Sequence, residues 1–111
     1  MKSEPLTIDD TPGLQDGERI LKLTGPLLLS NLFEFQNKAR TDASPKLVLD
    51  FTNVPYIDSA GIGALVGAYV NRQKDAGRSL ILVGVNQRVR QALQVTHVEQ
   101  FFKFEDVAAV N

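Results

Sequence analysis

The sequence predicts an α/β protein with a mixed sheet of four or five strands and about four helices packed mainly on one face. Two short aliphatic runs, 46–51 and 80–83, have the continuous apolar character of strands that are buried on both faces. Each is followed by a segment with helical periodicity, at 60–76 and 86–96. Strands separated by single helices favour parallel pairing with right-handed crossovers.

Two strands are predicted at the start of the chain. Residues 6–8 form a short edge strand, and residues 19–23 form a half-buried strand with partial alternation. Turn signals lie between them at 11–13 and 16–17, and Gly25-Pro26 ends the second strand.

A first helix is predicted next, with Ser30 as its N-cap. Its inner face is expected to carry Leu32, Phe33, Gln36 and Ala39, with Phe35 on the flank. Two phenylalanines two positions apart on a helix cannot both face inward fully, so we expect one of them to be exposed. The helix should stop before Ser44-Pro45, because proline disfavours helical geometry in the residue ahead of it.

The longest helix is predicted at 60–76, after the connection at 52–55. Its packed face is expected to carry Ile62, Leu65, Val66, Tyr69 and Val70. Gly77 suits the position that follows a helix, where a positive φ is common.

The last part of the chain predicts a helix, a strand and a short terminal helix. Asn86 is a suitable N-cap for a helix with the inner face Val89, Ala92, Leu93 and Thr96. The final strand is predicted at 101–104, and Asp106 is expected to begin the terminal helix.

The composition limits the classes of function that we expect for this chain. The chain has 111 residues, which predicts one domain over 1–111. With 12 basic and 13 acidic residues, it lacks the cationic surplus of a nucleic-acid-binding protein. It contains no cysteine and one histidine, so we expect no metal and no cofactor. The apolar stretch at 60–70 is shorter than the roughly 20 residues of a membrane span. We expect a cytoplasmic protein without nucleic-acid or membrane partners.

The most informative motif is Asp58-Ser59-Ala60-Gly61-Ile62-Gly63, which stands where the longest helix begins. The first N–H groups of a helix have no internal partner and carry partial positive charge. Ser59 can therefore cap the helix, as Asp58 can, or it can be exposed and open to modification.

This motif resembles the loop of the STAS family, which includes the anti-sigma factor antagonists and related domains of sulfate transporters. The resemblance extends over residues 19–110, including the strand before the loop, Gly77 before the next strand, and the segment 89–93. It implies a phosphorylation switch: an unmodified antagonist binds an anti-sigma factor that is also a serine kinase, and the phosphorylated form is released. Carried over by position, Ser59 is the phosphoacceptor.

The resemblance also implies a partner-binding surface, with a phosphatase as a further partner and no enzymatic activity of the chain itself. By position that surface comprises Asp58, Ser59, Ala60, Gly61, Ile62, Gly63, Leu27 and Leu28. Leu28 stands where the family usually carries an aspartate, and Pro26 precedes it. This departure motivates the alternative of a non-switching STAS subunit that binds a transport ATPase or a stress-signalling complex.

Other features have ordinary interpretations. Gly61, Gly63 and Gly67 give G-x-G-x-x-x-G, which is not the dinucleotide-binding spacing. His97 has no second ligand nearby in the sequence, and we expect it to lie in a loop or on the surface. Ser59 and His97 could in principle form the nucleophile and base of a hydrolase, but the sequence lacks the G-x-S-x-G motif that positions such a serine. Five basic residues are expected on a solvated face or a contact area for an acidic partner: Arg72, Lys74, Arg78, Arg88 and Arg90.

Overall fold

A computed structural model describes residues 4–106 of the chain. The strands are β1 (Thr7–Pro12), β2 (Glu18–Thr24), β3 (Lys46–Asn53), β4 (Ser79–Val83) and β5 (Lys103–Glu105). The helices are α1 (Phe33–Thr41), α2 (Ser59–Gln73) and α3 (Gln87–Val95), followed by a 3₁₀ turn, Glu99–Phe101.

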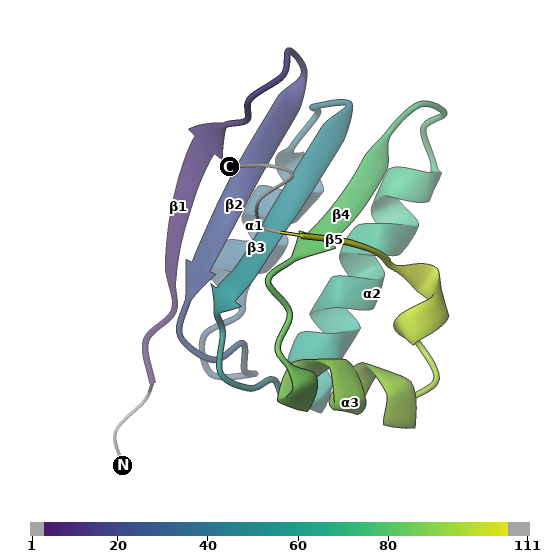
Figure 1. The fold of residues 1–111 in the computed structure, drawn as a ribbon. Helices are drawn as coiled ribbons and strands as arrows, with labels where there is room; N and C mark the ends of the chain where they lie inside the picture. Colours follow the sequence, from purple (N-terminus) through teal and green to yellow (C-terminus); the bar gives the residue numbers. More distant parts are fainter. Residues whose placement is uncertain (1–3, 107–111) are drawn as a thin grey trace.

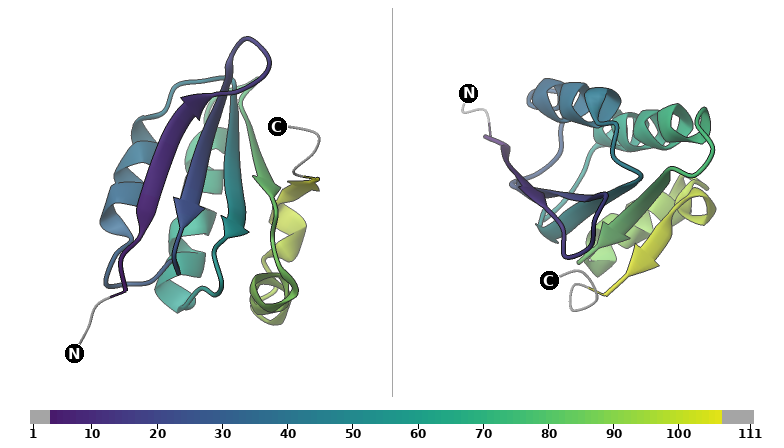
Figure 2. Two further views of the ribbon diagram at one scale, coloured as in Figure 1. Left: turned by 60° about the vertical axis from the view of Figure 1, so that its left-hand side comes forward. Right: turned by 90° about the horizontal axis from the view of Figure 1, so that it is seen from above.

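The strands form one mixed sheet in the order β1-β2-β3-β4-β5 (Figure 1). β1 is antiparallel to β2, and every other neighbouring pair is parallel. α1 and α2 cover one face of the sheet (Figure 2, right), and α3 lies below the carboxyl ends of β3 and β4 as drawn in Figure 1. The predicted α/β class with a mixed sheet is confirmed, with three α-helices over residues 4–106; the terminal helix predicted from Asp106 lies outside the described residues.

The main core fills the space between the sheet and the helices. Alternate residues of the central strands point into it, including Leu47, Leu49 and Phe51 of β3, and they meet Phe35 of α1, Leu65 of α2 and Leu93 of α3. A smaller apolar cluster lies on the opposite face of the sheet and comprises Ile20, Val48, Ile81 and Val83. The central strands are thus buried on both faces, as their continuous apolar runs predict.

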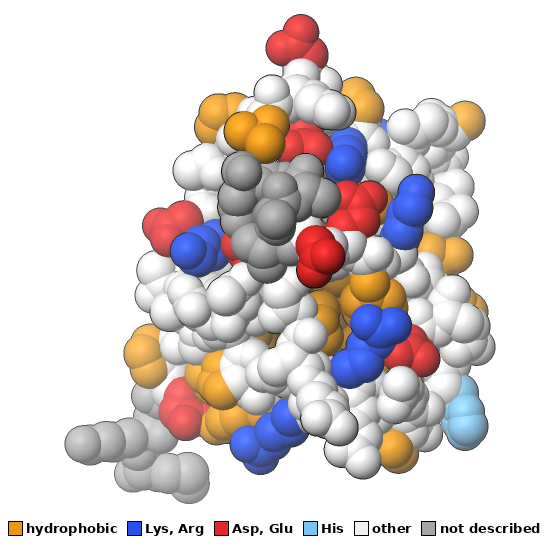
Figure 3. All heavy atoms as spheres, in the orientation of Figure 1, with side chains coloured by type: hydrophobic (Ala, Val, Ile, Leu, Met, Phe, Trp, Pro, Cys, Tyr) orange, Lys and Arg blue, Asp and Glu red, His pale blue; other side chains and the backbone are white. Residues whose placement is uncertain are grey.

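Figure 3 shows the face of the sheet that α1 and α2 do not cover, where acidic and basic side chains are interspersed. Lys46 pairs there with Glu18 at 3.2 Å and lies 3.9 Å from Glu105. A mixed surface of this kind gives no field of a single sign for nucleic acid.

The first helix differs from the prediction. Ser30 is not its N-cap: Leu32 takes that position without a side-chain hydrogen bond, because residues 28–31 form a turn. Phe35 and Ala39 are buried, whereas Phe33 is 70% exposed, so the prediction that Phe33 lies on the inner face and Phe35 on the flank is wrong. Gln36 is exposed as well, which makes its predicted place on the inner face wrong.

Two further boundaries and the orientation of two side chains are corrected. β1 extends through Pro12, which the sequence placed in a turn; proline is tolerated at the end of an edge strand because it needs no ladder N–H there. α2 ends at Gln73, three residues early, although Gly77 has the expected positive φ. Val70 and Thr96 were predicted to face inward and are exposed.

Candidate functional site

The Ser59 loop lies between β3 and α2, and two neighbouring segments hold it. Asn86, the N-cap of α3, donates from Nδ2 to the carbonyl oxygens of Val54 at 3.0 Å and Pro55 at 3.3 Å. On the other side Leu27 and Ile57 form an isolated parallel bridge. Residues 54–57 are therefore held between α3 and the 26–31 loop, and Ser59 follows them in the chain.

Asp58 caps α2 and also joins it to the 26–31 loop. Its Oδ1 accepts the Gly61 N–H at 2.8 Å, and its Oδ2 accepts the Leu29 N–H at 3.0 Å. A carboxylate suits this position because it satisfies an otherwise unpaired N–H of the first turn and adds negative charge at the positive end of the helix.

Ser59 is the first residue of α2, and it is exposed. Because Asp58 performs the capping, the Ser59 hydroxyl is not needed for it, and among residues 4–106 no protein group is hydrogen-bonded to that hydroxyl. Of the two roles that the sequence left open for this serine, capping therefore belongs to its neighbour.

The two glycines of the motif have different surroundings. Gly61 is buried, and a Cβ at this position would overlap the Leu27 carbonyl oxygen and lie 2.6 Å from Ile57 Cγ1. Gly63 is exposed, and a Cβ there would meet nothing within 4 Å. Gly61 is thus required by the packing of α2 on the 26–31 loop, and Gly63 is not required by any contact of the described chain.

The three consecutive leucines of the 26–31 loop are divided between core and surface. Leu27 is fully buried, Leu28 is half-buried and Leu29 is 64% exposed. In the α2 segment of the predicted surface, Ile62 is buried and Ala60 is half-buried. The structure thus brings residues 27–28 beside residues 57–58, with Leu27, Gly61 and Ile62 beneath the exposed Ser59 and Gly63.

Asn31 organises this region and was not singled out from the sequence. Its Oδ1 accepts the Leu28 N–H, and its Nδ2 donates to the carbonyl oxygens of Pro26 and Glu4, each at 2.9 Å. Asn frequently closes turns through its own side chain, so its place after Ser30 was a usable signal. Leu29 was not included in the predicted partner-binding surface either, although it is the most exposed of the three consecutive leucines.

An aromatic and a basic residue stand next to the loop. The Arg88 guanidinium of α3 lies 4.8 Å from the centre of the Tyr56 ring. The Tyr56 hydroxyl bonds to the Glu4 carboxylate, and this bond raises the pKa of Tyr56 above its ordinary value. The contacts place a cation over the aromatic ring three residues before Ser59.

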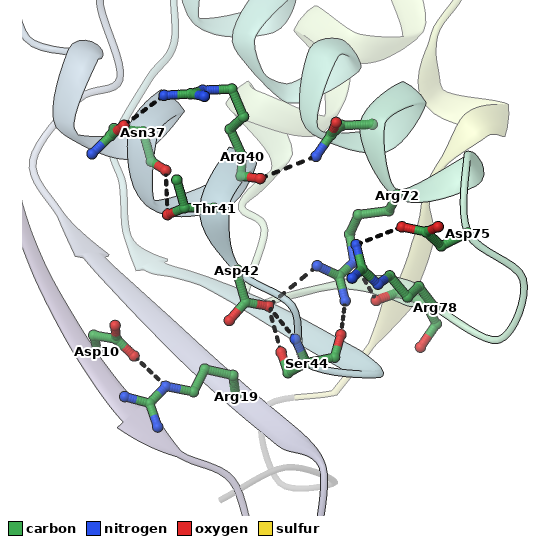
Figure 4. Close-up of polar contacts among 12 residues, drawn as sticks. Asp10, Arg19, Asn37, Arg40, Thr41, Asp42, Ser44, Arg72, Asp75 and Arg78 are labelled. Atoms are coloured by element: carbon green, nitrogen blue, oxygen red, sulfur yellow. Dashed lines mark hydrogen bonds and ion pairs between the residues drawn. The ribbon is translucent and has the colours of Figure 1, made fainter.

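The basic residues do not form one surface. Arg72 is only 2% exposed and donates to Asp42 at 3.2 Å, to the Ser79 carbonyl at 3.0 Å and to the Ser44 carbonyl (Figure 4). Arg78 pairs with Asp75 at 2.9 Å, and Arg90 pairs with Glu99. The expectation that Arg72 lies on a solvated face is wrong, because a carboxylate and two carbonyl groups compensate its burial.

His97 follows the far end of α3 and is exposed in the left-handed region, with φ of 62°. Asn86, at the near end, is the residue that touches the Ser59 loop. A nine-residue helix spans about 13 Å, so no Ser59–His97 pair is assembled. Within residues 4–106 no group of three or more metal-ligating side chains occurs, and no helix there is long and apolar enough to cross a membrane.

The model of the STAS domain matches residues 10–109 of the chain. This protein belongs to the STAS domain family. An anti-sigma-B factor antagonist of Listeria monocytogenes is 32% identical over 62 residues, which cover 55% of this chain. That alignment spans 53% of the Listeria protein, so the chain spans about half the length of the curated relatives it matches.

Solved structures show the same fold for this STAS protein. A crystal structure of a candidate anti-sigma factor antagonist from Thermotoga maritima superposes with a TM-score of 0.80 at 20% identity, covering 92% of this chain and 89% of that one. The antagonist SpoIIAA superposes in its unphosphorylated form, with a TM-score of 0.69, 17% identity, and 91% and 89% coverage of the two chains. Its phosphorylated form, from Bacillus, gives 0.70, 19%, and 91% of both chains.

Proposed function

We propose that this protein is an anti-sigma factor antagonist whose binding to an anti-sigma factor is switched by phosphorylation of Ser59. The observation that carries the proposal is that Asp58, and not Ser59, caps α2. Asp58 caps the helix, and the exposed Ser59 hydroxyl is left for another use. The 32% identity to a protein named anti-sigma-B factor antagonist supports an anti-sigma factor as the partner.

The helix start tolerates a phosphate. Phosphorylation would add a charge of about −1.5 to −2 at Ser59. Helix N-termini stabilise anions through their free N–H groups and their dipole. The modified protein should therefore keep its fold, with the new charge displayed at the surface.

A partner pressed against the loop would respond differently. Burying a doubly charged group without compensating cations costs several kcal/mol, and about 1.4 kcal/mol already weakens binding tenfold. A single modification can thus release the anti-sigma factor, free it to bind its sigma factor again, and leave the antagonist folded. A phosphatase would restore the binding form. In this proposal the chain itself is a binding module, and the chemistry belongs to the kinase.

The proposal is tested with a serine kinase of the anti-sigma factor class from the same genome. The kinase and ATP are incubated with the wild type, with Ser59→Ala and with Ser30→Ala, in which another exposed serine is removed. We expect one phosphate on the wild type and on Ser30→Ala, and none on Ser59→Ala, by mass spectrometry. A phosphate that persists in Ser59→Ala contradicts the assignment. Stable binding of the kinase without any phosphorylation supports a non-switching subunit instead.

A further inference from the structure

An open groove of about 640 Å³ runs between α1 and α2. Ala39, Ala64 and Ala68 form its floor, because their small side chains leave space between the two helices. Val66 and the half-exposed Val70 line it from α2, and Gln36 lines it from α1. Asn71 joins the helices at one end by donating to the Arg40 carbonyl oxygen at 3.3 Å. The groove is thus apolar along most of its length.

Two positions along α2 make the groove wider than the fold requires. Gly63 and Gly67 line it, four residues apart, and a Cβ at either would meet nothing within 4 Å. Glycine inside a helix is less stable than alanine, so the packing of this chain gives no reason for either residue. Without side chains at both, another backbone can approach α2 closely.

All charged side chains that line the groove are positive. Arg40 and Lys74 line one end of it, and no lining residue is acidic. Among residues 4–106 neither cation has a carboxylate within ion-pair distance; the Arg40 guanidinium donates only to the Asn37 side chain, at 2.8 Å (Figure 4). A ligand that fills this groove should therefore be apolar along its length and negatively charged at the Arg40–Lys74 end.

We propose that the groove receives an α-helix of the partner protein, lying antiparallel to α2, with small apolar residues facing Gly63 and Gly67 and with carboxylates in its first turn facing Arg40 and Lys74. Acidic residues are favoured at a helix N-terminus, so the charges of such a helix lie at the end where the groove is cationic. Small side chains on both helices allow close packing. The inference rests on the proposed function, since it names the surface that the anti-sigma factor covers.

The same orientation connects the groove to Ser59. Ser59 lies one turn before Gly63, and residues four apart share a helix face. The C-terminal end of the bound helix, which carries partial negative charge, would lie near Ser59 and the positive start of α2. A phosphate at Ser59 would repel this end, so phosphorylation would act on the groove as well as on the loop.

A synthetic helical peptide tests the groove without the kinase. The probe has Glu in its first turn, Ala and Leu along one face and uncharged polar residues elsewhere; the control peptide carries Lys in place of Glu. Each is titrated into the ¹⁵N-labelled full chain. We expect the Glu peptide to shift the amides of Gly63, Gly67, Val70 and Asn71, and the Lys peptide to bind at least tenfold more weakly at low salt.

Three variants define the site. Arg40→Glu with Lys74→Glu should weaken the Glu peptide at least tenfold, and Gly67→Leu, which fills the open space, should do the same. Lys103→Glu on β5 changes charge away from the groove and should stay within twofold. Dispersed amide spectra verify that each variant is folded, and Gly67→Ala, which meets no atom, should raise the melting temperature.

Shifts confined to other surfaces, or equal binding of the two peptides, would overturn the inference. Shifts at the groove amides that depend on protein concentration without peptide would also overturn it, because they would assign the groove to a second copy of the chain. The kinase assay on Ser59 tests the proposed function independently of the peptide titration. Peptide binding without phosphorylation would refute that function alone, and phosphorylation without peptide binding would refute the groove alone.

Discussion

The Asp58 carboxylate accepts the backbone N–H of Leu29 at 3.0 Å, across 29 positions of sequence. The same carboxylate caps α2 through Gly61. One side chain therefore sets the position of the exposed leucine relative to the proposed phosphoacceptor, and it couples the order of the 26–31 loop to the start of α2.

Asp58→Ala should lower the free energy of unfolding by about 1–3 kcal/mol, because the cap of α2 and the Leu29 N–H both lose their acceptor. Asp58→Asn keeps one acceptor oxygen and should lose less. Urea unfolding followed by circular dichroism measures both. Equal losses for Ala and Asn would mean that the acceptor oxygen kept in Asp58→Asn adds no stability.

Gly61 and Gly63 should respond to alanine in opposite directions. Gly61→Ala places a Cβ against the Leu27 carbonyl group and should destabilise the protein by about 1–3 kcal/mol. Gly63→Ala enters open space and should stabilise it by about 0.5–1 kcal/mol. Thermal unfolding of the two variants side by side makes each the control for the other; a shared sign would contradict the assignment of their surroundings.

Ser59→Asp should weaken binding of the anti-sigma factor at least tenfold while the circular dichroism spectrum stays native, because the helix start accepts an anion and a partner surface does not. Calorimetric titration measures the affinity, and Ser59→Ala is the uncharged control. Loss of the native spectrum in Ser59→Asp would assign Ser59 a structural role.

Arg72→Ala should cost about 3–5 kcal/mol, since Asp42 and two carbonyl groups lose a buried donor. Arg78→Ala removes an ion pair with the exposed Asp75 and should cost less than about 1 kcal/mol. Both are measured by urea unfolding. A cost below 1 kcal/mol for Arg72→Ala would show that its contacts are replaced by water.

The Arg90–Glu99 pair should make stability depend on pH. A hydrogen bond from Arg90 holds the pKa of Glu99 below its ordinary 4.5 in the folded protein. A depressed folded pKa contributes stability that is complete above the unfolded value and is lost as pH falls through the folded one. The advantage of the wild type over Glu99→Gln should therefore be full at pH 7 and shrink below about pH 4.5.

Melting temperatures between pH 7 and pH 3 check this dependence, with Glu34→Gln as the control, because Glu34 is exposed and has no ion pair among the described residues. A difference between wild type and Glu99→Gln that stays constant over this range would contradict it.

Local patterns predicted much of the fold from sequence. The two doubly buried strands followed from their aliphatic runs, and the Asn86 cap followed from its place before a periodic segment; its Oδ1 accepts the Val89 N–H at 2.8 Å. The position of the Asp58–Gly63 motif at the start of the longest helix was also predictable, because it depends on residues adjacent in sequence.

Features that depend on distant partners were not predictable in this way. Arg72 is buried because Asp42, 30 positions earlier, meets it, and a basic residue near the end of a helix gives no sign of this. Ser30 was predicted as a cap because serine is a common N-cap, and the turn-forming tendency of the neighbouring Asn31, which bonds to Leu28 and Pro26, was overlooked. The choice between Phe33 and Phe35 depended on how α1 rotates against the sheet.

The exposed strand β1 has a consequence for how the protein behaves in concentrated solution. Its outer edge pairs with no strand among residues 4–106, and such an edge is a template for aggregation. Asp9 places an exposed charged side chain on this strand, and Pro12 offers no N–H at the strand's end. The edge is therefore poorly suited to recruiting a foreign or identical strand.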